Sequence, residues 1–330
     1  MKKRYLPVLL SLMILSLVAG SCGPKKQTLA AKQPLSPLEL GKQNFEARDY
    51  AAAKTQFETV LSADSLNHEA VYFLGRIALQ NGEIDDAVNY FEKSVSMDET
   101  NSPYHFWLGV GYAQKVQKGA FQLAPRLKEE FEKAVELDGS NLEARMGLAQ
   151  FYMNAPPFAG GSQAKADEQV AAIIEQDPVK GHLFQAQIQT AKKDFEAAEK
   201  SYQAAAEADP KDPDIYFQMG MMYQAAKNYP AAFDALEKTL TLDPDYMNGL
   251  YQIGRTAIFA EDNLERGAEC LERYVKLTPG PGNPSLAHAH WRLGIIYEKM
   301  GKKDMARKEY ETALGLKPDL KEAQEALEKL

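Results

Sequence analysis

The chain has 330 residues, of which 45% are hydrophobic and 25% charged, a balance typical of a globular protein and not of a disordered or fibrous one. Its formal net charge is −8, and lysine and arginine alternate with acidic residues instead of forming a basic patch. Binding to phosphate backbones needs a clustered basic face, so this pattern argues against nucleic acid as a partner. It is typical of solvent-exposed helix faces instead.

The first 22 residues, MKKRYLPVLLSLMILSLVAGSC, have a basic start, an apolar run from Leu6 to Ala19 and then small residues. This order predicts a secretory signal peptide over residues 1–21. The apolar run is shorter than the ~20 residues that a transmembrane helix needs, so a permanent transmembrane anchor is the weaker interpretation.

The residues from Val18 to Cys22, VAGSC, resemble a bacterial lipobox, in which the cysteine sulfur is alkylated with diacylglycerol. The resemblance implies that Cys22 is the lipidated N-terminus, and more than one acyl chain would anchor it stably in a membrane. Ala19 stands where the lipobox usually has leucine and would also suit ordinary signal peptidase, so a soluble periplasmic protein is the alternative. Gly23 replaces the aspartate of inner-membrane retention, which implies an outer-membrane lipoprotein facing the periplasm.

The segment after the cysteine, GPKKQTLAAKQPLSP, lacks apolar periodicity and contains three prolines. Residues 22–37 are therefore expected to be a lipidated N-terminus followed by a flexible tether. The other cysteine, Cys270, has no partner once Cys22 is modified, so we expect no disulfide framework. Cys270 is predicted to be a small buried apolar residue.

A period of 34 residues runs through the rest of the chain. It is marked by glycines at Gly41, Gly75 and Gly109, and again at Gly220 and Gly254. Twelve residues after several of these glycines stands an alanine, followed four residues later by a large apolar residue, as in Ala87 and Phe91. Small residues at fixed sites let two helices approach, and large ones fill the space beside them.

This motif resembles the tetratricopeptide repeat, in which Leu-Gly-x2-Tyr marks the first helix, Ala-x3-Phe the second, and a proline closes the repeat. Pro210 and Pro244 are closing prolines of this kind, because proline cannot continue a helix interior. The resemblance implies an all-α, right-handed solenoid over residues 38–319 with a capping helix over residues 320–330. About eight helical hairpins are expected, over residues 34–67, 68–101, 102–141, 142–180, 181–212, 213–246, 247–285 and 286–319.

The third and fourth repeats carry insertions, in QKVQKGAFQLAPR and MNAPPFAGGSQAK. Both fall between the paired helices of consecutive repeats, so they are expected on one edge of the solenoid, where they could form a joint lip. Phe158, at the tip of the second insertion, is a candidate contact for a partner. The alternative is that Phe158 packs down on the convex side.

In this family the concave surface uses the position two before the leucine and the position one after the glycine of each first helix. Such positions lie four residues apart and share a helix face. The resemblance implies a partner-binding groove lined by Tyr72, Arg76, Phe106, Met146, Phe217, Met221, Tyr251, Arg255 and Trp291. The two arginines would meet carboxylates of a bound peptide. The alternative is that the aromatic residues pack against neighbouring helices, with Trp291 filling the end of the stack.

The sequence has no P-loop, His-Glu-x-x-His or Gly-x-Ser-x-Gly motif. His288 and His290 are two residues apart and would point in different directions, so we expect no metal site, no cofactor and no catalytic residue. We predict a non-enzymatic, lipid-anchored scaffold that binds envelope proteins or peptides. The alternative is a solute-binding component of a transport system that encloses a small ligand. The pattern does not indicate the oligomeric state.

Overall fold

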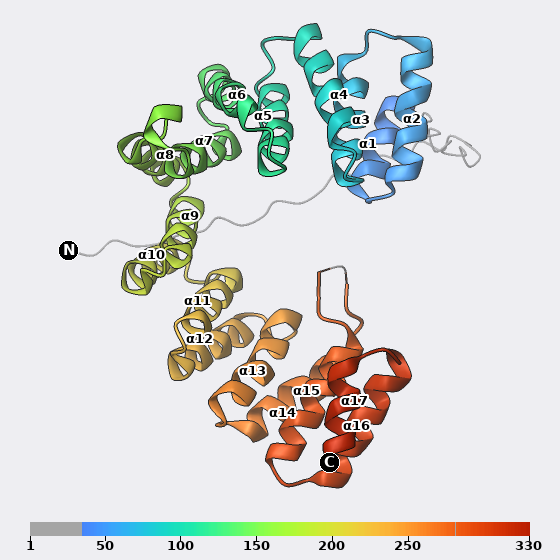
Figure 1. Cartoon of the computed structure of the whole chain (residues 1–330), viewed down its shortest axis with the longest axis vertical. Coiled ribbons are helices and arrows are strands. Elements are labelled where there is room, and N and C mark those ends of the chain that lie inside the picture. Colours follow the sequence, from blue (N-terminus) through green and yellow to red (C-terminus); the bar gives the residue numbers. More distant parts are fainter. Residues whose placement is uncertain (1–34, 281) are drawn as a thin grey trace, which may run out of the picture.

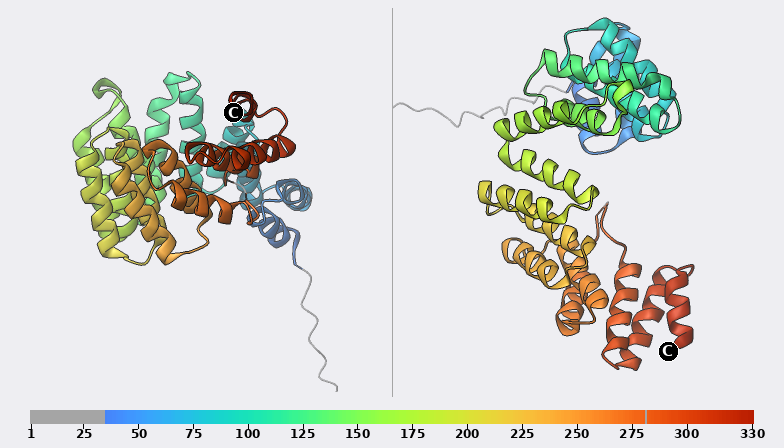
Figure 2. Two further views of the ribbon diagram at one scale, coloured as in Figure 1. Left: turned by 90° about the horizontal axis from the view of Figure 1, so that it is seen from below. Right: turned by 60° about the vertical axis from the view of Figure 1, so that its left-hand side comes forward.

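The computed structural model describes residues 35–280 and 282–330, and this part of the chain is built from α-helices and two short 3-10 helices, with no strand. The helices stack side by side into a curved arc (Figure 1). Figure 2 shows the same curved stack from two further directions. The predicted all-α solenoid is thus confirmed. The predicted signal peptide, Cys22 and the tether up to residue 34 lie outside the described residues.

The α-helices have these bounds: α1 Pro37–Glu46, α2 Tyr50–Ala63, α3 His68–Gln80, α4 Ile84–Met97, α5 Ser102–Gln117, α6 Ala124–Leu137, α7 Leu142–Asn154, α8 Gln163–Gln176, α9 Pro178–Ala191, α10 Phe195–Ala208, α11 Pro213–Ala225, α12 Tyr229–Leu242, α13 Met247–Ala260, α14 Leu264–Tyr274, α15 Leu286–Lys299, α16 Lys303–Leu316 and α17 Lys321–Lys329. The 3-10 helices η1, Phe121–Leu123, and η2, Pro157–Ala159, lie in the two insertions.

Each odd-numbered helix from α1 to α15 packs against the even-numbered helix that follows it, which gives the expected eight hairpins. The capping helix α17 packs on α16 and α15. Two boundaries differ slightly from expectation. Pro37, expected in the tether, is the first residue of α1 after the capping residue Ser36. The fifth hairpin begins at Pro178, because the side chain of Asp177 caps α9.

The signature glycine of each regular hairpin faces the large residue of the second helix. A Cβ atom at Gly75 would lie 2.7 Å from Cε1 of Phe91, and one at Gly109 would lie 2.6 Å from the same atom of Phe131. Both phenylalanine rings are buried. The absence of a side chain at the glycine therefore lets the two helices of a hairpin approach closely.

A repeated hydrogen bond ties each of several hairpins to the one before it. The tyrosine three residues after the signature position donates its hydroxyl proton to a glutamate on the second helix of the preceding hairpin. The pairs and their O–O distances are Tyr112 with Glu92 at 2.5 Å, Tyr152 with Glu132 at 2.7 Å, Tyr223 with Glu199 at 2.8 Å, and Tyr297 with Glu272 at 2.5 Å. The signature tyrosine thus fixes the register between hairpins.

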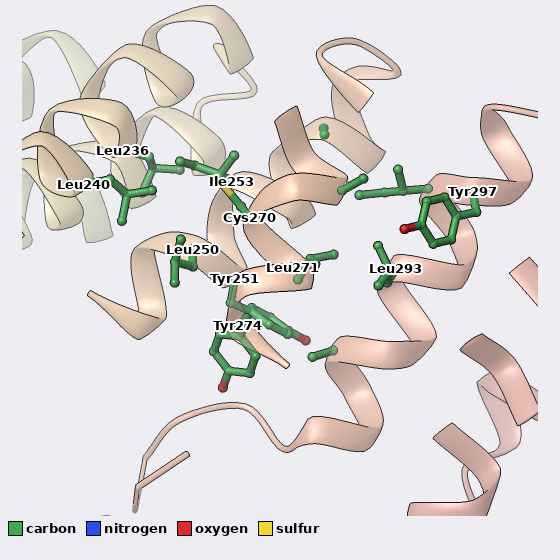
Figure 3. Packing of buried hydrophobic residues seen from close by; sticks show 14 of the residues in the cluster. Leu236, Leu240, Leu250, Tyr251, Ile253, Cys270, Leu271, Tyr274, Leu293 and Tyr297 are labelled. Atoms are coloured by element: carbon green, nitrogen blue, oxygen red, sulfur yellow. The ribbon is translucent and has the colours of Figure 1, made fainter. Parts of the chain in front are cut away.

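The largest apolar cluster extends from α12 to α16 (Figure 3). Cys270 lies in it and is fully buried, as predicted. Burial raises the pKa of this thiol to about 12, so it is a packing residue and not a reactive one.

His105 on α5 joins two elements through both ring nitrogens. Nδ1 lies 2.6 Å from Oε2 of Glu130 on α6, and Nε2 lies 3.0 Å from the carbonyl oxygen of Glu99. Burial of the ring disfavours the charged form, but the hydrogen bonds to Glu130 and to the Glu99 carbonyl outweigh it, so the pKa of His105 is raised. The protonated ring donates to both acceptors.

Gly75→Ala is expected to lower the free energy of unfolding by about 1–3 kcal/mol, because the added Cβ would overlap the buried ring of Phe91. Gly315→Ala in α16 is the matched control. A Cβ there meets nothing within 4 Å. Alanine favours a helix over glycine by up to about 1 kcal/mol, so this variant should be slightly more stable than wild type. Thermal unfolding followed by circular dichroism gives the melting temperature of both variants. Equal changes in melting temperature would contradict the close approach of the two helices at Gly75.

Glu130→Gln should flatten the pH dependence of stability that His105 causes. The pKa of His105 is higher in the folded chain than in the unfolded chain, where it is about 6.5. The stabilisation by the pair is therefore fully present below about pH 6.5 and is lost as pH rises through the folded-state value. The free energy of unfolding of wild type should exceed that of the variant most between about pH 5 and 6.5. This difference should narrow toward about pH 9.

Urea unfolding over a pH series measures this gap. Glu129→Gln, at the exposed neighbouring position, is the control and should show no such narrowing. A constant difference between Glu130→Gln and wild type over the whole series would mean that His105 is not stabilised in its charged form.

Candidate protein-binding groove

The residues predicted to line the groove all lie on first helices of hairpins, between α3 and α15. In the middle of the solenoid these helices form the inner side of the arc (Figure 1). The exposed fraction divides the predicted residues into two groups. The half-buried group, which reaches the inner surface, comprises Arg76, Phe106, Met146, Phe217, Met221, Arg255 and Trp291.

Tyr72 and Tyr251 are buried, with 9% and 6% of their surface exposed, so they do not line an open groove. The Tyr72 ring packs 4.9 Å from that of Tyr104, and the Tyr251 ring lies 5.5 Å from that of Tyr274. Figure 3 shows the second pair side by side in the core. For these two residues the alternative interpretation, packing against neighbouring helices, is the correct one.

Arg76 lies among aromatic rings near the N-terminal end of the inner face. Its guanidinium carbon is 3.7 Å from the ring centre of Trp107 and 5.1 Å from that of Phe45. Nη1 donates a hydrogen bond of 2.8 Å to the hydroxyl of Tyr72, while the buried Nε has no partner among the described residues. The rings hold this cation in place by cation–π attraction, and part of its donor capacity is unused.

A second cationic cluster lies on α13 and α15. Arg292 donates from Nε to the hydroxyl of Tyr251 at 2.7 Å and stacks 4.9 Å from the ring of Trp291. Arg255 lies 5.1 Å from the ring of Phe259, and its buried Nε has no partner among the described residues. Burial, and next the positive charge of Arg292, lower the pKa of Arg255. Two cations that repel each other thus share this part of the inner face.

Carboxylates neutralise several arginines outside the inner face, such as Arg126 with Glu92 and Arg266 with Glu237. No ion pair between described residues involves Arg76, Arg255 or Arg292. A desolvated cation is costly without a counter-charge. These three side chains are therefore suited to accept a carboxylate from outside the chain.

Phe217, Met221 and Trp291 supply the apolar part of the C-terminal half of the groove. Phe217 packs 5.2 Å from the ring of Tyr246 and remains half-buried. Trp291 contacts two apolar clusters, both of which include residues of the capping helix, and is also half-buried. It therefore fills part of the end of the stack, while part of its surface stays accessible on the inner face.

Phe106 and Met146 line a pocket of ≈ 940 Å³ in the third and fourth hairpins. Its floor includes Phe131 and Leu127 from α6, and its walls come from α5 and α7. Both insertions line it as well, through Phe121 in η1 and Phe158 in η2. The insertions thus border one pocket from the same edge of the solenoid.

The tips of the two insertions are exposed. Phe121 has 73% of its surface accessible and Phe158 has 94%, so Phe158 does not pack down on the fold. The second insertion is held by backbone hydrogen bonds of 3.1 Å from Gly161 to the Pro156 carbonyl and 2.9 Å from Ser162 to the Tyr152 carbonyl. This loop conformation is therefore built into the fold and presents Phe158 to solvent.

Sequence reasoning missed four residues of this surface: Trp107, Phe121, Glu143 and Arg292. Phe121 lies in an insertion that the repeat period predicts. An aromatic residue in that insertion could have been named as a candidate contact, as Phe158 was. Trp107 and Arg292 lie directly before the signature leucines Leu108 and Leu293, a position that the repeat pattern does not assign to the groove.

The two neighbouring histidines of α15 have separate partners. Nδ1 of His288 lies 2.7 Å from the hydroxyl of Ser285, and Nδ1 of His290 lies 2.6 Å from Glu309. Within residues 35–280 and 282–330, no three His, Cys, Asp or Glu side chains are grouped as metal ligands would be. No helix in the same ranges combines the length and the apolar character that crossing a bilayer requires.

Comparison with known proteins agrees with this architecture. Models of the tetratricopeptide repeat match residues 38–114, 183–246 and 287–320, just over half of the chain. The chain belongs to the tetratricopeptide repeat family, whose members generally act as protein-interaction scaffolds. The unmatched segment over residues 115–182 contains both insertions, which interrupt the period.

Similar proteins include the BBSome complex member BBS4 from Bos taurus, 23% identical over 70% of this chain and 42% of BBS4. The peroxisomal targeting signal receptor from Candida albicans is 22% identical over 70% of this chain and 39% of the receptor. The chain spans less than half the length of the curated relatives it matches.

Two solved structures share the fold. A tetratricopeptide repeat protein from Parabacteroides merdae superposes with a TM-score of 0.52 and 14% identity, over 79% of this chain and 97% of that one. The C-terminal part of a tetratricopeptide repeat protein from Cytophaga hutchinsonii superposes with a TM-score of 0.51 and 16% identity, over 78% of this chain and 99% of that one. At these identities the likeness concerns the fold alone.

Proposed function

We propose that this protein is a non-enzymatic scaffold that binds other envelope proteins through the inner groove of its solenoid. The observation that carries the proposal is the set of three guanidinium groups, of Arg76, Arg255 and Arg292, which stack on aromatic rings without a carboxylate among the described residues. A partner segment with acidic side chains would supply the missing counter-charges. The half-buried rings of Phe217 and Trp291 would serve as apolar contacts beside them.

We further propose that the scaffold is attached through a lipidated Cys22 to the outer membrane and faces the periplasm. The support is the resemblance of the VAGSC stretch to a lipobox and the glycine that follows it. An anchored solenoid would keep its groove within reach of the membrane surface, at a distance limited by the length of the tether. A soluble periplasmic protein is the alternative.

A second candidate function is the binding of a small solute. The pocket of ≈ 940 Å³ favours it, because ligand sites occupy roughly 300–1,000 Å³ and are mostly apolar. A solute binder should show a higher melting temperature of the purified protein with its ligand, since binding to the folded state adds stability by mass action. A protein-binding scaffold should show that rise with a partner and not with members of a small-molecule library.

Arg255→Gln should weaken binding of a partner by about 30-fold, equivalent to about 2 kcal/mol, because the variant keeps the fold but removes an unpaired cation from the groove. Crosslinking in intact cells followed by mass spectrometry identifies the partner, and titration calorimetry with the purified partner measures affinity. Tyr251 is unsuited to this test, since truncation of a buried ring reports on folding.

Arg307→Gln is the matched control, because Arg307 is exposed on α16, a second helix. It should leave the affinity unchanged. Unaltered affinity in Arg255→Gln, with a melting temperature equal to wild type, would refute the groove as the binding surface.

Cys22→Ser tests the anchor separately. Serine cannot be alkylated at sulfur, so the exported variant is expected in the soluble periplasmic fraction without detergent, while wild type stays with the outer membrane. Fractionation and immunoblotting measure the distribution. Membrane retention of the variant equal to wild type would count against lipidation at this residue.

A further inference from the structure

We infer that the pocket between the two insertions binds a peptide segment of a partner that carries bulky apolar side chains beside a basic residue. The inference rests on the proposed function, since it names what part of the same inner face would hold. It concerns α5, α6, α7 and the insertions with η1 and η2, and it does not involve the three unpaired arginines.

The first argument is the apolar character of the pocket. Phe106, Phe131, Met146 and Phe151 present apolar atoms to a volume of ≈ 940 Å³. Interface cores are enriched in such side chains and depleted of charge. The pocket is large enough for more than one bulky side chain of a guest.

The exposed tips give the second argument. Phe121 and Phe158 lie on separate insertions, at 73% and 94% exposure, and both line the pocket. An aromatic ring that becomes covered contributes favourably to binding in proportion to its buried apolar area. The backbone bonds from Gly161 and Ser162 already hold the second tip in place, so little ordering is needed on binding.

The third argument distinguishes a peptide from a hydrocarbon. The side-chain amides of Gln114, Gln117, Gln150 and Asn154 line the pocket, three of them exposed and Gln114 half-buried, and none is hydrogen-bonded to another side chain within residues 35–280 and 282–330, so all four are free to contact a guest. On α11, by contrast, the amide of Gln224 donates to the hydroxyl of Thr256 at 2.7 Å. Each amide offers both donors and an acceptor, which match the N–H and C=O groups of a peptide backbone. An acyl chain has no such groups.

Charge gives the fourth argument. Glu143, in the first turn of α7, is the charged side chain in the pocket lining, and it is exposed. It forms no ion pair with a described residue, whereas Lys128 and Lys133 on the adjacent α6 pair with Glu132 and Glu136. A lysine or arginine next to the apolar anchors would complement this carboxylate. The carboxylate of a fatty acid would be repelled by the Glu143 carboxylate, and the described pocket lining has no cation to bind it.

Fluorescence anisotropy tests the inference with labelled 12-residue peptides on the full chain carrying Cys22→Ser. Each peptide has two phenylalanines among serine and glutamine, with Lys, Gln or Glu beside them. The Lys peptide should bind about tenfold more tightly than the Glu peptide. Glu143→Gln should remove this preference and retain binding. Phe121→Ala and Phe158→Ala should each weaken binding at least about tenfold.

Leu66→Ala is the control, because Leu66 is also 73% exposed but lies between the first two hairpins. It should not change the affinity. Failure of all peptides to bind, or equal binding in Phe121→Ala and Phe158→Ala, would overturn the inference. So would displacement of the Lys peptide by a fluorescent dodecanoic acid that binds in its place, or a dimer in sedimentation that Phe158→Ala abolishes.

The outcome is separable from that of the proposed function. Arg255→Gln should leave peptide affinity unchanged, because Arg255 lies outside the pocket. If no peptide binds while Arg255→Gln still loses binding to its cellular partner, the inference about the pocket is wrong and the proposed scaffold function is retained. If Arg255→Gln keeps its partner at wild-type affinity, the proposed function fails by its own experiment.

Discussion

The structure depends on the close packing of two helices within a hairpin, which a glycine permits opposite a large buried side chain. Phe91 and Phe131 occupy the space that a side chain at Gly75 or Gly109 would need. A single hairpin closed in this way still exposes apolar surface on both sides, so each hairpin is stable only against its neighbours. The hydrogen bonds from Tyr112 and Tyr152 to glutamates of the preceding hairpins then fix the stacking register.

Because stacking uses only certain positions, the period of the sequence predicted the helices well. The number of hairpins and the capping helix follow from where glycine, alanine and proline recur. Exposure at the groove was less predictable. Tyr72 and Phe106 hold the same repeat position, yet Tyr72 is buried against Tyr104 while Phe106 opens into a pocket. The repeat position determines the direction of a side chain, but residues of the next hairpin determine how much of it they cover.

The insertions set the limit of prediction from a period. Their length and edge could be deduced, since they fall between paired helices. The outward direction of Phe158 could not, because it depends on irregular backbone hydrogen bonds around Pro156 and Gly161. At Gly160, φ is +96°, a conformation that favours glycine. Such loops obey local turn chemistry and not the helical period.

The charges of the inner face differ along the solenoid. Cations without carboxylates lie toward its two ends, at Arg76 on α3 and at Arg255 and Arg292 on α13 and α15. Between them lies a pocket that is apolar and amide-rich, with Glu143 as its charge. Since like charges placed opposite each other are costly, a guest with the reversed order of charges would be disfavoured. The fold supplies a regular row of positions, and the side chains left free of stacking determine which partner sequence can match them in register.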